Sequence, residues 1–309
     1  MLANIANRIF PSEANALRPR LACEITGAGV VAARPGDAEQ EIVSSFAPLR
    51  PGVLAAGLQS PNFTDRAAIA AALRQALDEI SLKQSQITVV VPDAAVRVLM
   101  LDFDVLPAKA AEAVPIIRFR LRKLVPFEVE DAAVSYQVMP GKTGLVRVIV
   151  AVSPAAVVAE YESAVREAGY EPGVVLPSTM AVLAAVGSDE PALVVNRNGT
   201  SLTTAITRQN ELLLHRTLEL TEKSWSPREN TLHSLEELQQ SVTVAIAYFE
   251  DTLTVPPRQL LCCGFAEPAE LTNLLGDNRI PVRELVPASY ISRTMPGGML
   301  AGVVGALAN

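Results

Sequence analysis

The stretch LACEITGAGVVAARPGDAEQEIVSSFAPLRPGVLAA, residues 21–56, decides the fold class, because short apolar runs alternate in it with glycine and proline turns. That alternation is typical of an antiparallel meander, in which each turn reverses the chain. We expect its strands over 21–25, 30–33, 41–46 and 53–56.

Helical spacing begins directly after this meander. Ile69, Leu73, Leu77 and Ile80 fall three or four residues apart, which predicts an amphipathic helix with Thr64 as its cap. The continuous apolar run 87–91 is typical of a buried strand. A smaller β-α-β-β cycle follows and is interpreted as an inserted subdomain over about 96–153, with strands 96–103, 133–139 and 145–152 and a helix over 108–124.

The second half of the chain repeats the same order. Strands are predicted over 193–195, 201–207, 211–218, 259–263 and 281–285, with helices over 268–275 and near 299–307. A capping box at Ser234 and Glu237 predicts the start of one long helix. We therefore divide the chain into an N-terminal extension, 1–19, a first α/β domain, 20–188, and a second, 189–309.

Composition excludes several classes of protein. With 309 residues, half of them hydrophobic, the chain is long enough for about two folded domains and is not disordered. Its net charge of −7 argues against a nucleic-acid binder, and two histidines without cysteine partners at ligand spacing argue against a zinc site. No apolar run reaches membrane-spanning length and no signal peptide is evident, so a cytoplasmic location is expected.

Two glycine turns resemble phosphate-binding motifs only formally. Gly27-x-Gly29-x-x-Ala32 fits the dinucleotide pattern, but it opens a short strand where that motif requires a helix. Gly141-Lys142-Thr143 resembles the end of a P-loop, but predicted strands flank it on both sides. Both turns are interpreted as hairpin turns.

Three stretches carry a resemblance to a known family: VPDAAV (91–96), LVPFEVED (124–131) with SYQ (135–137), and ELQQS (237–241). They resemble the PilM family of the actin-like ATPase superfamily, cytoplasmic proteins of the type IV pilus inner-membrane assembly platform. The resemblance implies an α/β, actin-like two-domain fold with a duplicated ribonuclease H-like core and an inserted β-α-β-β subdomain.

The resemblance also implies a nucleotide site in which the usual residues are altered. Its two phosphate turns and its adenosine turn fall on Glu24, Thr26, Gly27, Asn196, Gly199, Thr203 and Gly264. Glu24-Ile25-Thr26 stands where the family has Asp-Ile-Gly, Asn196 replaces an aspartate, and Phe265 replaces a glycine. Because Mg²⁺ prefers anionic oxygen ligands, we expect ATP and Mg²⁺ to bind weakly or not at all, and we assign no catalytic residue and no other metal.

One basic cluster lies in the inserted subdomain: Arg118, Phe119, Arg120, Arg122 and Lys123. It is either a solvated helix face paired with Glu128, Glu130 and Asp131, or a docking surface. The resemblance implies the second, with a groove between the first subdomain and the insertion for the N-terminal peptide of a PilN-like membrane protein. Such a surface also suits the headgroups of an anionic membrane.

Three functions follow from these expectations. The leading one is a structural adaptor that is peripheral to the inner membrane and couples pilus motor components to a PilN-like protein. The alternatives are an active actin-fold ATPase or small-molecule kinase using Glu24, Asn196 and Thr203, and a filament protein of the same superfamily.

Overall fold

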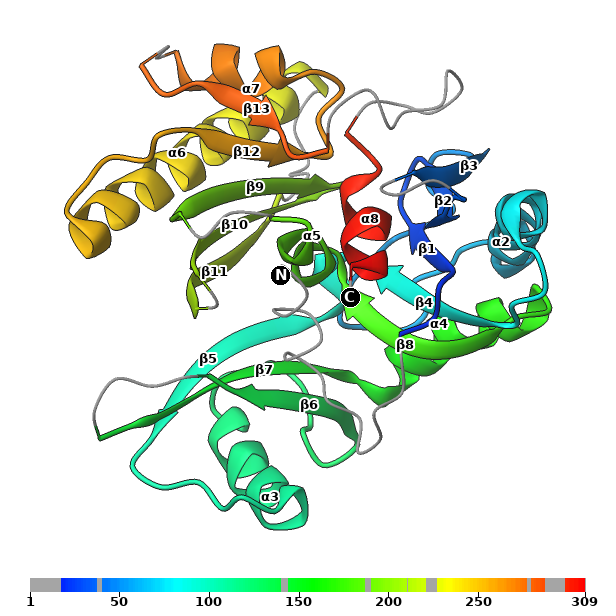
Figure 1. Cartoon of the computed structure of the whole chain (residues 1–309), viewed down its shortest axis with the longest axis horizontal. Coiled ribbons are helices and arrows are strands. Elements are labelled where there is room, and N and C mark those ends of the chain that lie inside the picture. The colour runs from blue at the N-terminus through cyan, green and yellow to red at the C-terminus, as the bar shows by residue number, and fades with distance from the viewer. Residues whose placement is uncertain are drawn as a thin grey trace.

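The computed structural model describes residues 18–37, 41–139, 144–186, 190–209, 211–220, 227–276, 279–286 and 298–308. These residues form two five-stranded sheets and one three-stranded sheet (Figure 1). The start of the predicted N-terminal extension lies outside the described residues.

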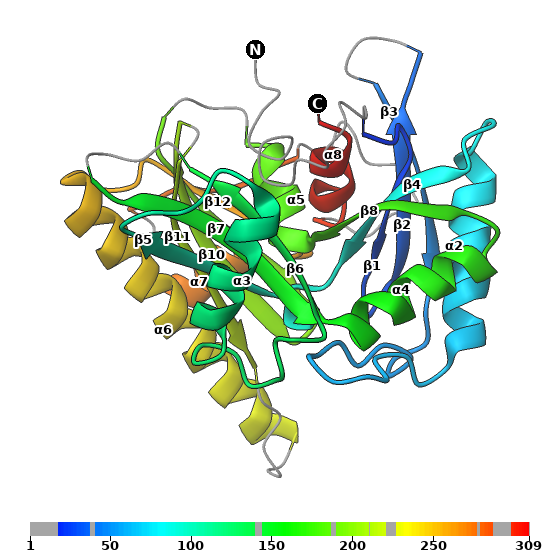
Figure 2. The ribbon, with the colours of Figure 1, turned by 90° about the horizontal axis from the view of Figure 1, so that it is seen from below.

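The first sheet has the strand order β3-β2-β1-β4-β8. Its strands are β1 (Ala22–Ile25), β2 (Gly29–Pro35), β3 (Ile42–Pro48), β4 (Gln86–Val91) and β8 (Glu171–Pro177). The first three form the predicted antiparallel meander, whereas β4 and β8 run parallel to β1. Helices α2 (Arg66–Ile80) and α4 (Ala155–Glu167) cover one face, and α5 (Ser178–Ala184) and α8 (Ala301–Leu307) cover the other (Figure 2).

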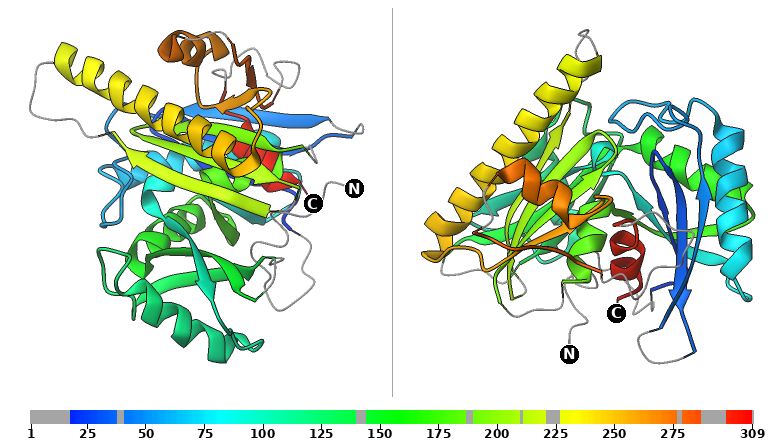
Figure 3. Two further views of the ribbon diagram at one scale, coloured as in Figure 1. Left: turned by 90° about the vertical axis from the view of Figure 1, so that its left-hand side faces the viewer. Right: turned by 90° about the horizontal axis from the view of Figure 1, so that it is seen from above.

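The second sheet repeats this topology in the order β11-β10-β9-β12-β13. Its strands are β9 (Ala192–Asn198), β10 (Ser201–Arg208), β11 (Glu211–Glu219), β12 (Leu260–Cys263) and β13 (Val282–Glu284). Again three antiparallel strands are followed by strands parallel to the first. Helices α6 (Pro227–Leu253) and α7 (Pro268–Leu275) lie on its outer face (Figure 3).

The inserted subdomain has the predicted β-α-β-β order. Strands β5 (Arg97–Phe103), β6 (Ala132–Val138) and β7 (Val146–Pro154) form an antiparallel sheet in the order β5-β7-β6, entered through a short turn, η1 (Asp93–Ala95). Helix α3 (Ala110–Leu121) buries Ala113, Ile117 and Leu121 against this sheet and continues through Pro115. The alternation of apolar and basic residues after Pro115 thus belongs to a helix, as predicted.

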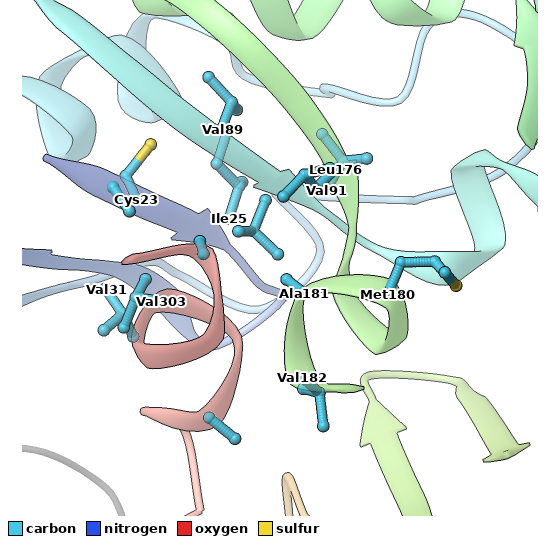
Figure 4. Packing of buried hydrophobic residues seen from close by; sticks show 14 of the residues in the cluster. Cys23, Ile25, Val31, Val89, Val91, Leu176, Met180, Ala181, Val182 and Val303 are labelled. Carbon is cyan, nitrogen blue, oxygen red and sulfur yellow. The ribbon is translucent and has the colours of Figure 1, made fainter. Parts of the chain in front are cut away.

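Helices α5 and α8 pack against each other between the two sheets. Figure 4 shows Met180, Ala181 and Val182 of α5 and Val303 of α8 within the apolar core formed with β1, β4 and β8. The contact needs a glycine, because a Cβ at Gly305 would overlap the carbonyl oxygen of Ala181. The last helix therefore returns to the first sheet, although the domain division of the sequence assigned it to the second domain, and those boundaries stay predictions.

Three local predictions are wrong. Residues 53–56 form no strand, since Leu54 makes only an isolated bridge to Phe63. Asp65 caps α2 by accepting a hydrogen bond from the backbone N of Ala68 at 3.0 Å, while the Thr64 hydroxyl donates to the Gly52 carbonyl at 2.7 Å. Helix α6 begins at Pro227, before the capping box that was expected to start it.

Candidate functional site

A cavity of about 250 Å³ lies where the turn after β1 faces the turn after β9. Two of its walls come from these turns, and a third comes from the segment that leads into α8. The cavity is lined by Glu24, Thr26, Gly27, Ala28, Val182, Asn196, Arg197, Asn198, Gly199, Cys263, Gly264, Gly298, Met299, Ala301 and Gly302. Residues far apart in the sequence therefore meet at one interdomain site.

The structure brings together six of the seven residues predicted for the nucleotide site. The six that line the cavity are Glu24, Thr26, Gly27, Asn196, Gly199 and Gly264. Thr203 does not line it, because it is fully buried on β10. Proximity alone does not make these residues a nucleotide site, and their hydrogen bonds decide what they can hold.

The Glu24 carboxylate is buried and already hydrogen-bonded. Its Oε1 accepts from the Ser178 hydroxyl at 2.7 Å and from the Asn198 side-chain amide at 3.3 Å. Burial raises the pKa of Glu24 to about 7, and the nearby charge of Asp93 adds to the rise, while the two hydrogen bonds oppose it. Gly302 closes the other side, because a Cβ there would meet the carboxylate.

The Asn196 side chain is held in the same network. Its Nδ2 donates to the Ser178 hydroxyl at 3.1 Å and to the Thr179 hydroxyl at 3.0 Å. Both acceptors lie at the start of α5, so Asn196 ties the second sheet to the interdomain helix. An aspartate at this position would lack these donors.

Asp93 is the centre of a second buried network. Its carboxylate accepts from the backbone N of Thr179 at 2.9 Å, from the Thr179 hydroxyl, and from the Thr203 hydroxyl at 2.8 Å. The Thr203 hydroxyl also lies 2.9 Å from that of Thr217. Thr203, predicted as a phosphate contact, thus links the second sheet to η1 instead.

Sequence reasoning missed Asp93, Ser178, Thr179 and Asn198 as members of the site. Asp93 follows the buried run of β4, and Ser178 and Thr179 follow β8. The carboxyl ends of parallel strands are where α/β sheets place functional side chains. That rule could have identified Asp93, but no residue pattern over 171–186 pointed to the two hydroxyls.

Gly264 needs to be a glycine for a structural reason. Its φ is +74°, and a Cβ would overlap the carbonyl oxygen of Arg197. Phe265, which replaces the second glycine, packs in the core of the second sheet rather than in the cavity, with the Arg197 guanidinium 5.9 Å from its ring centroid. The aromatic ring therefore does not fill the cavity.

The residues that line the cavity offer few oxygen ligands to Mg²⁺. Glu24 is the one carboxylate among its lining residues, and its oxygen already has two donors. Within the described ranges, no group of three His, Cys, Asp or Glu side chains could hold a metal ion. Small-molecule pockets usually enclose about 300 to 1,000 Å³, more than this cavity offers.

The basic cluster of α3 divides into held and available side chains. Arg118 donates to the backbone carbonyls of Val129, Glu130 and Ala132, so it fastens the 122–131 segment to the helix. Arg122 Nε donates to the Glu130 carboxylate at 2.7 Å, and its guanidinium lies 6.0 Å from the centroid of the Phe119 ring.

The remaining members face solvent. Phe119 is 69% exposed, and Arg120 and Lys123 are exposed without an ion pair to any described residue. The solvated-face interpretation thus holds for Arg122, whereas Phe119, Arg120 and Lys123 are available to a partner.

Within the described residues, no helix combines the length and apolarity that crossing a bilayer requires.

Comparison with known proteins places the fold. No protein-family model matches the chain, and no curated protein matches its sequence. A chain of the solved PilM-PilN type IV pilus biogenesis complex superposes with a TM-score of 0.71 at 21% identity, covering 94% of this chain and 98% of its own. A Bacteroides thetaiotaomicron protein with actin-like ATPase fold and unknown function gives a TM-score of 0.51 at 12% identity, covering 93% and 94%. The predicted actin-like fold is thereby confirmed.

Proposed function

We propose that this actin-like chain is a structural adaptor of a type IV pilus assembly platform, which binds the cytoplasmic N-terminal peptide of a PilN-like inner-membrane protein and meets pilus motor components. The similarity to the PilM-PilN complex over nearly the whole chain supports the proposal. In this proposal the chain is cytoplasmic and reaches the inner membrane through its partner.

The hydrogen bonds between the two domains support a scaffold function rather than an ATPase function. In phosphoryl transfer, catalysis comes from positioned charges that contact the phosphates and the metal. Here the carboxylate of Glu24 and the amide of Asn196 are spent on Ser178, Thr179 and Asn198. The protein's own side chains thus link the two sides of the cleft, which supports a fixed scaffold with a degenerate nucleotide site.

The exposed face of α3 supports the partner site. Phe119 offers an apolar anchor, and Arg120 and Lys123 offer cations that no described residue neutralises. Aromatic side chains and arginine are enriched where partners bind. Arg118, which the sequence suggested as a contact, contributes instead by holding the neighbouring segment in place.

Titration calorimetry tests this assignment with a synthetic peptide of the cytoplasmic N-terminus of the PilN-like protein from the same organism. The double variant Arg120→Glu and Lys123→Glu should weaken binding about tenfold without changing the melting temperature. Lys83→Glu, an exposed charge reversal in the loop after α2, is the control and should bind normally. Equal affinities for all three proteins would remove this face from the proposal.

The ATPase alternative has its own test. Mg²⁺-dependent ATP hydrolysis above background that Asn196→Ala abolishes would support an active enzyme. We expect no such activity, because the Asn196 amide is committed to two hydroxyls within the protein.

A further inference from the structure

The inserted sheet has an open edge. In the order β5-β7-β6, β6 pairs with β7 on one side and with no described strand on the other. The backbone N of Met139 donates to the carbonyl of Arg147 at 2.8 Å, so the backbone groups of residue 139 point toward β7. In an antiparallel pair every second residue bonds to the same neighbouring strand, so Ser135 and Gln137 also bond to β7. The backbone groups of Val134, Tyr136 and Val138 therefore point outward.

The start of this edge is already covered by the protein itself. The Ala132 carbonyl accepts from Arg118 at 2.9 Å, and the Ala132 N donates to the Val129 carbonyl at 3.2 Å. Both groups point outward, as the alternation requires. The uncovered ladder therefore consists of Val134, Tyr136 and Val138, a length of roughly 13 Å.

Both faces beside the edge are bounded. The Val134 and Tyr136 side chains pack toward the core under α3, so Ala133, Ser135 and Gln137 face the opposite way. On that side α4 lies next to β6 (Figure 2). Ala133 and Ser135 are small and exposed, and the Gln137 Oε1 is buried without a partner among the described residues. The edge thus lies between α3 and α4, with an unused acceptor beside it.

We propose that an extended segment of a partner protein adds to β6 as a fourth strand of this sheet. The inference rests on the proposed function and specifies how the peptide is held: by backbone hydrogen bonds to Val134, Tyr136 and Val138. Unpaired strand edges are routinely covered in proteins, and this one has no cover within the described chain.

A single extended chain is the occupant that fits an edge flanked by α3 and α4. A second copy of this protein would have to bring its own β6 edge, which its own α3 and α4 flank in the same way. Acidic Glu130 and Asp131 precede β6 in each copy as well, which adds like charge to such a contact. A peptide carries none of this bulk.

Amide hydrogen exchange tests the pairing directly, with the same synthetic peptide as probe. In the free protein the amides of Ser135 and Gln137 should be protected and those of Val134, Tyr136 and Val138 should exchange fast. Saturating peptide should slow the latter three at least tenfold. Bound peptide without protection of these three amides overturns the inference and leaves the proposed function standing, whereas absence of binding overturns both.

A backbone variant gives a second, independent readout. Tyr136→Pro removes an outward N–H without breaking the β7 ladder, a position where edge strands tolerate proline. It should weaken peptide binding about tenfold or more, whereas Tyr136→Ala, which keeps the N–H, should bind within about threefold of wild type. Equal losses in the two variants would contradict strand addition, as would protection of the edge amides that rises with protein concentration in the absence of peptide.

Discussion

At the scale of single residues, the Glu24 carboxyl has an unusually high pKa for a glutamate. A carboxyl whose pKa lies near 7 changes charge under physiological conditions, and here it does so between two domains. Three titratable groups interact electrostatically with this carboxyl: Asp93, Cys23 and Cys263. Burial raises the pKa of both thiols above the physiological range. Asp93 raises the pKa of Glu24 further, so the folded state holds the proton of Glu24 more tightly than the unfolded state does.

Stability should therefore fall as the pH rises toward 8. The folded-state pKa of Glu24 is above its ordinary value of 4.5, so the folded state binds the extra proton. This contribution is complete below about pH 4.5, is lost as the pH rises through about 7, and amounts to at most about 3 kcal/mol. Glu24→Gln should flatten the dependence in urea unfolding at pH 5 to 8. Glu112→Gln, at an exposed glutamate, is the control and should keep the wild-type dependence of unfolding free energy on pH. The same dependence in Glu24→Gln would contradict the assignment.

Removing the Asp93 carboxylate should be among the costliest substitutions. Asp93→Ala leaves the Thr179 N–H and two threonine hydroxyls buried without their acceptor. The free energy of unfolding should drop by roughly 3 kcal/mol. Asp102→Ala, which breaks only an exposed pair with Arg147, should cost less than about 1 kcal/mol in the same urea titration. Similar losses for both variants would mean that the buried network contributes little.

At the scale of elements, the α5–α8 pair sets how closely the two halves approach. In a helix with free space around it, alanine normally raises the free energy of unfolding by about 0.5–1 kcal/mol relative to glycine. A glycine-to-alanine substitution that lowers this free energy therefore indicates that the added Cβ has no room. At Gly305 the new Cβ would meet the backbone of Ala181 on α5, the helix that also lines the cavity through Val182.

Gly305→Ala should therefore destabilise the protein by about 2 kcal/mol, against the intrinsic helix preference. Gly57→Ala, where a Cβ meets no atom within 4 Å, should leave stability nearly unchanged. Thermal unfolding of both variants beside wild type decides the matter. A stabilised Gly305→Ala protein would mean that α5 and α8 are less tightly packed than described.

The elements themselves were largely readable from residue spacing. Ile69, Leu73, Leu77 and Ile80 are buried on α2, as their spacing predicted. The cap of that helix was not readable, because the Thr64 hydroxyl is drawn to the Gly52 carbonyl by a non-local contact. The site was readable only in part for the same reason: Asp93 meets Thr179 and Thr203 through the packing of separate segments, which no local pattern records.

At the scale of the whole molecule, the two sheets are joined by hydrogen bonds between side chains. Glu24 from the first sheet binds Asn198 from the second, and Asp93 binds Thr203. Arg97 of the insertion also pairs with Glu219 of β11 at 2.6 Å. The three parts should therefore hold one arrangement without a ligand.

Mg²⁺-ATP should accordingly leave thermal stability unchanged. A ligand that binds only the folded state stabilises by about 2.7 kcal/mol at a hundredfold excess over its Kd, which a melting curve detects readily. We expect no rise in Tm at millimolar Mg²⁺-ATP, and a clear rise with the PilN-like peptide. A rise in Tm with Mg²⁺-ATP that the Asn196→Ala variant does not show would instead support a working nucleotide site.

The return of α8 to the first sheet has a consequence for how the protein is made. Strands β1, β2 and β4 leave the ribosome long before residues 301–307, which cover their inner face. Until those residues are translated, Val31 and its apolar neighbours have no partner on that side, and surfaces of this kind attract chaperones or aggregate. The first half of the chain is thus completed only once residues 301–307 have been translated, and a recombinant fragment of it needs the 301–307 helix supplied in trans or by fusion.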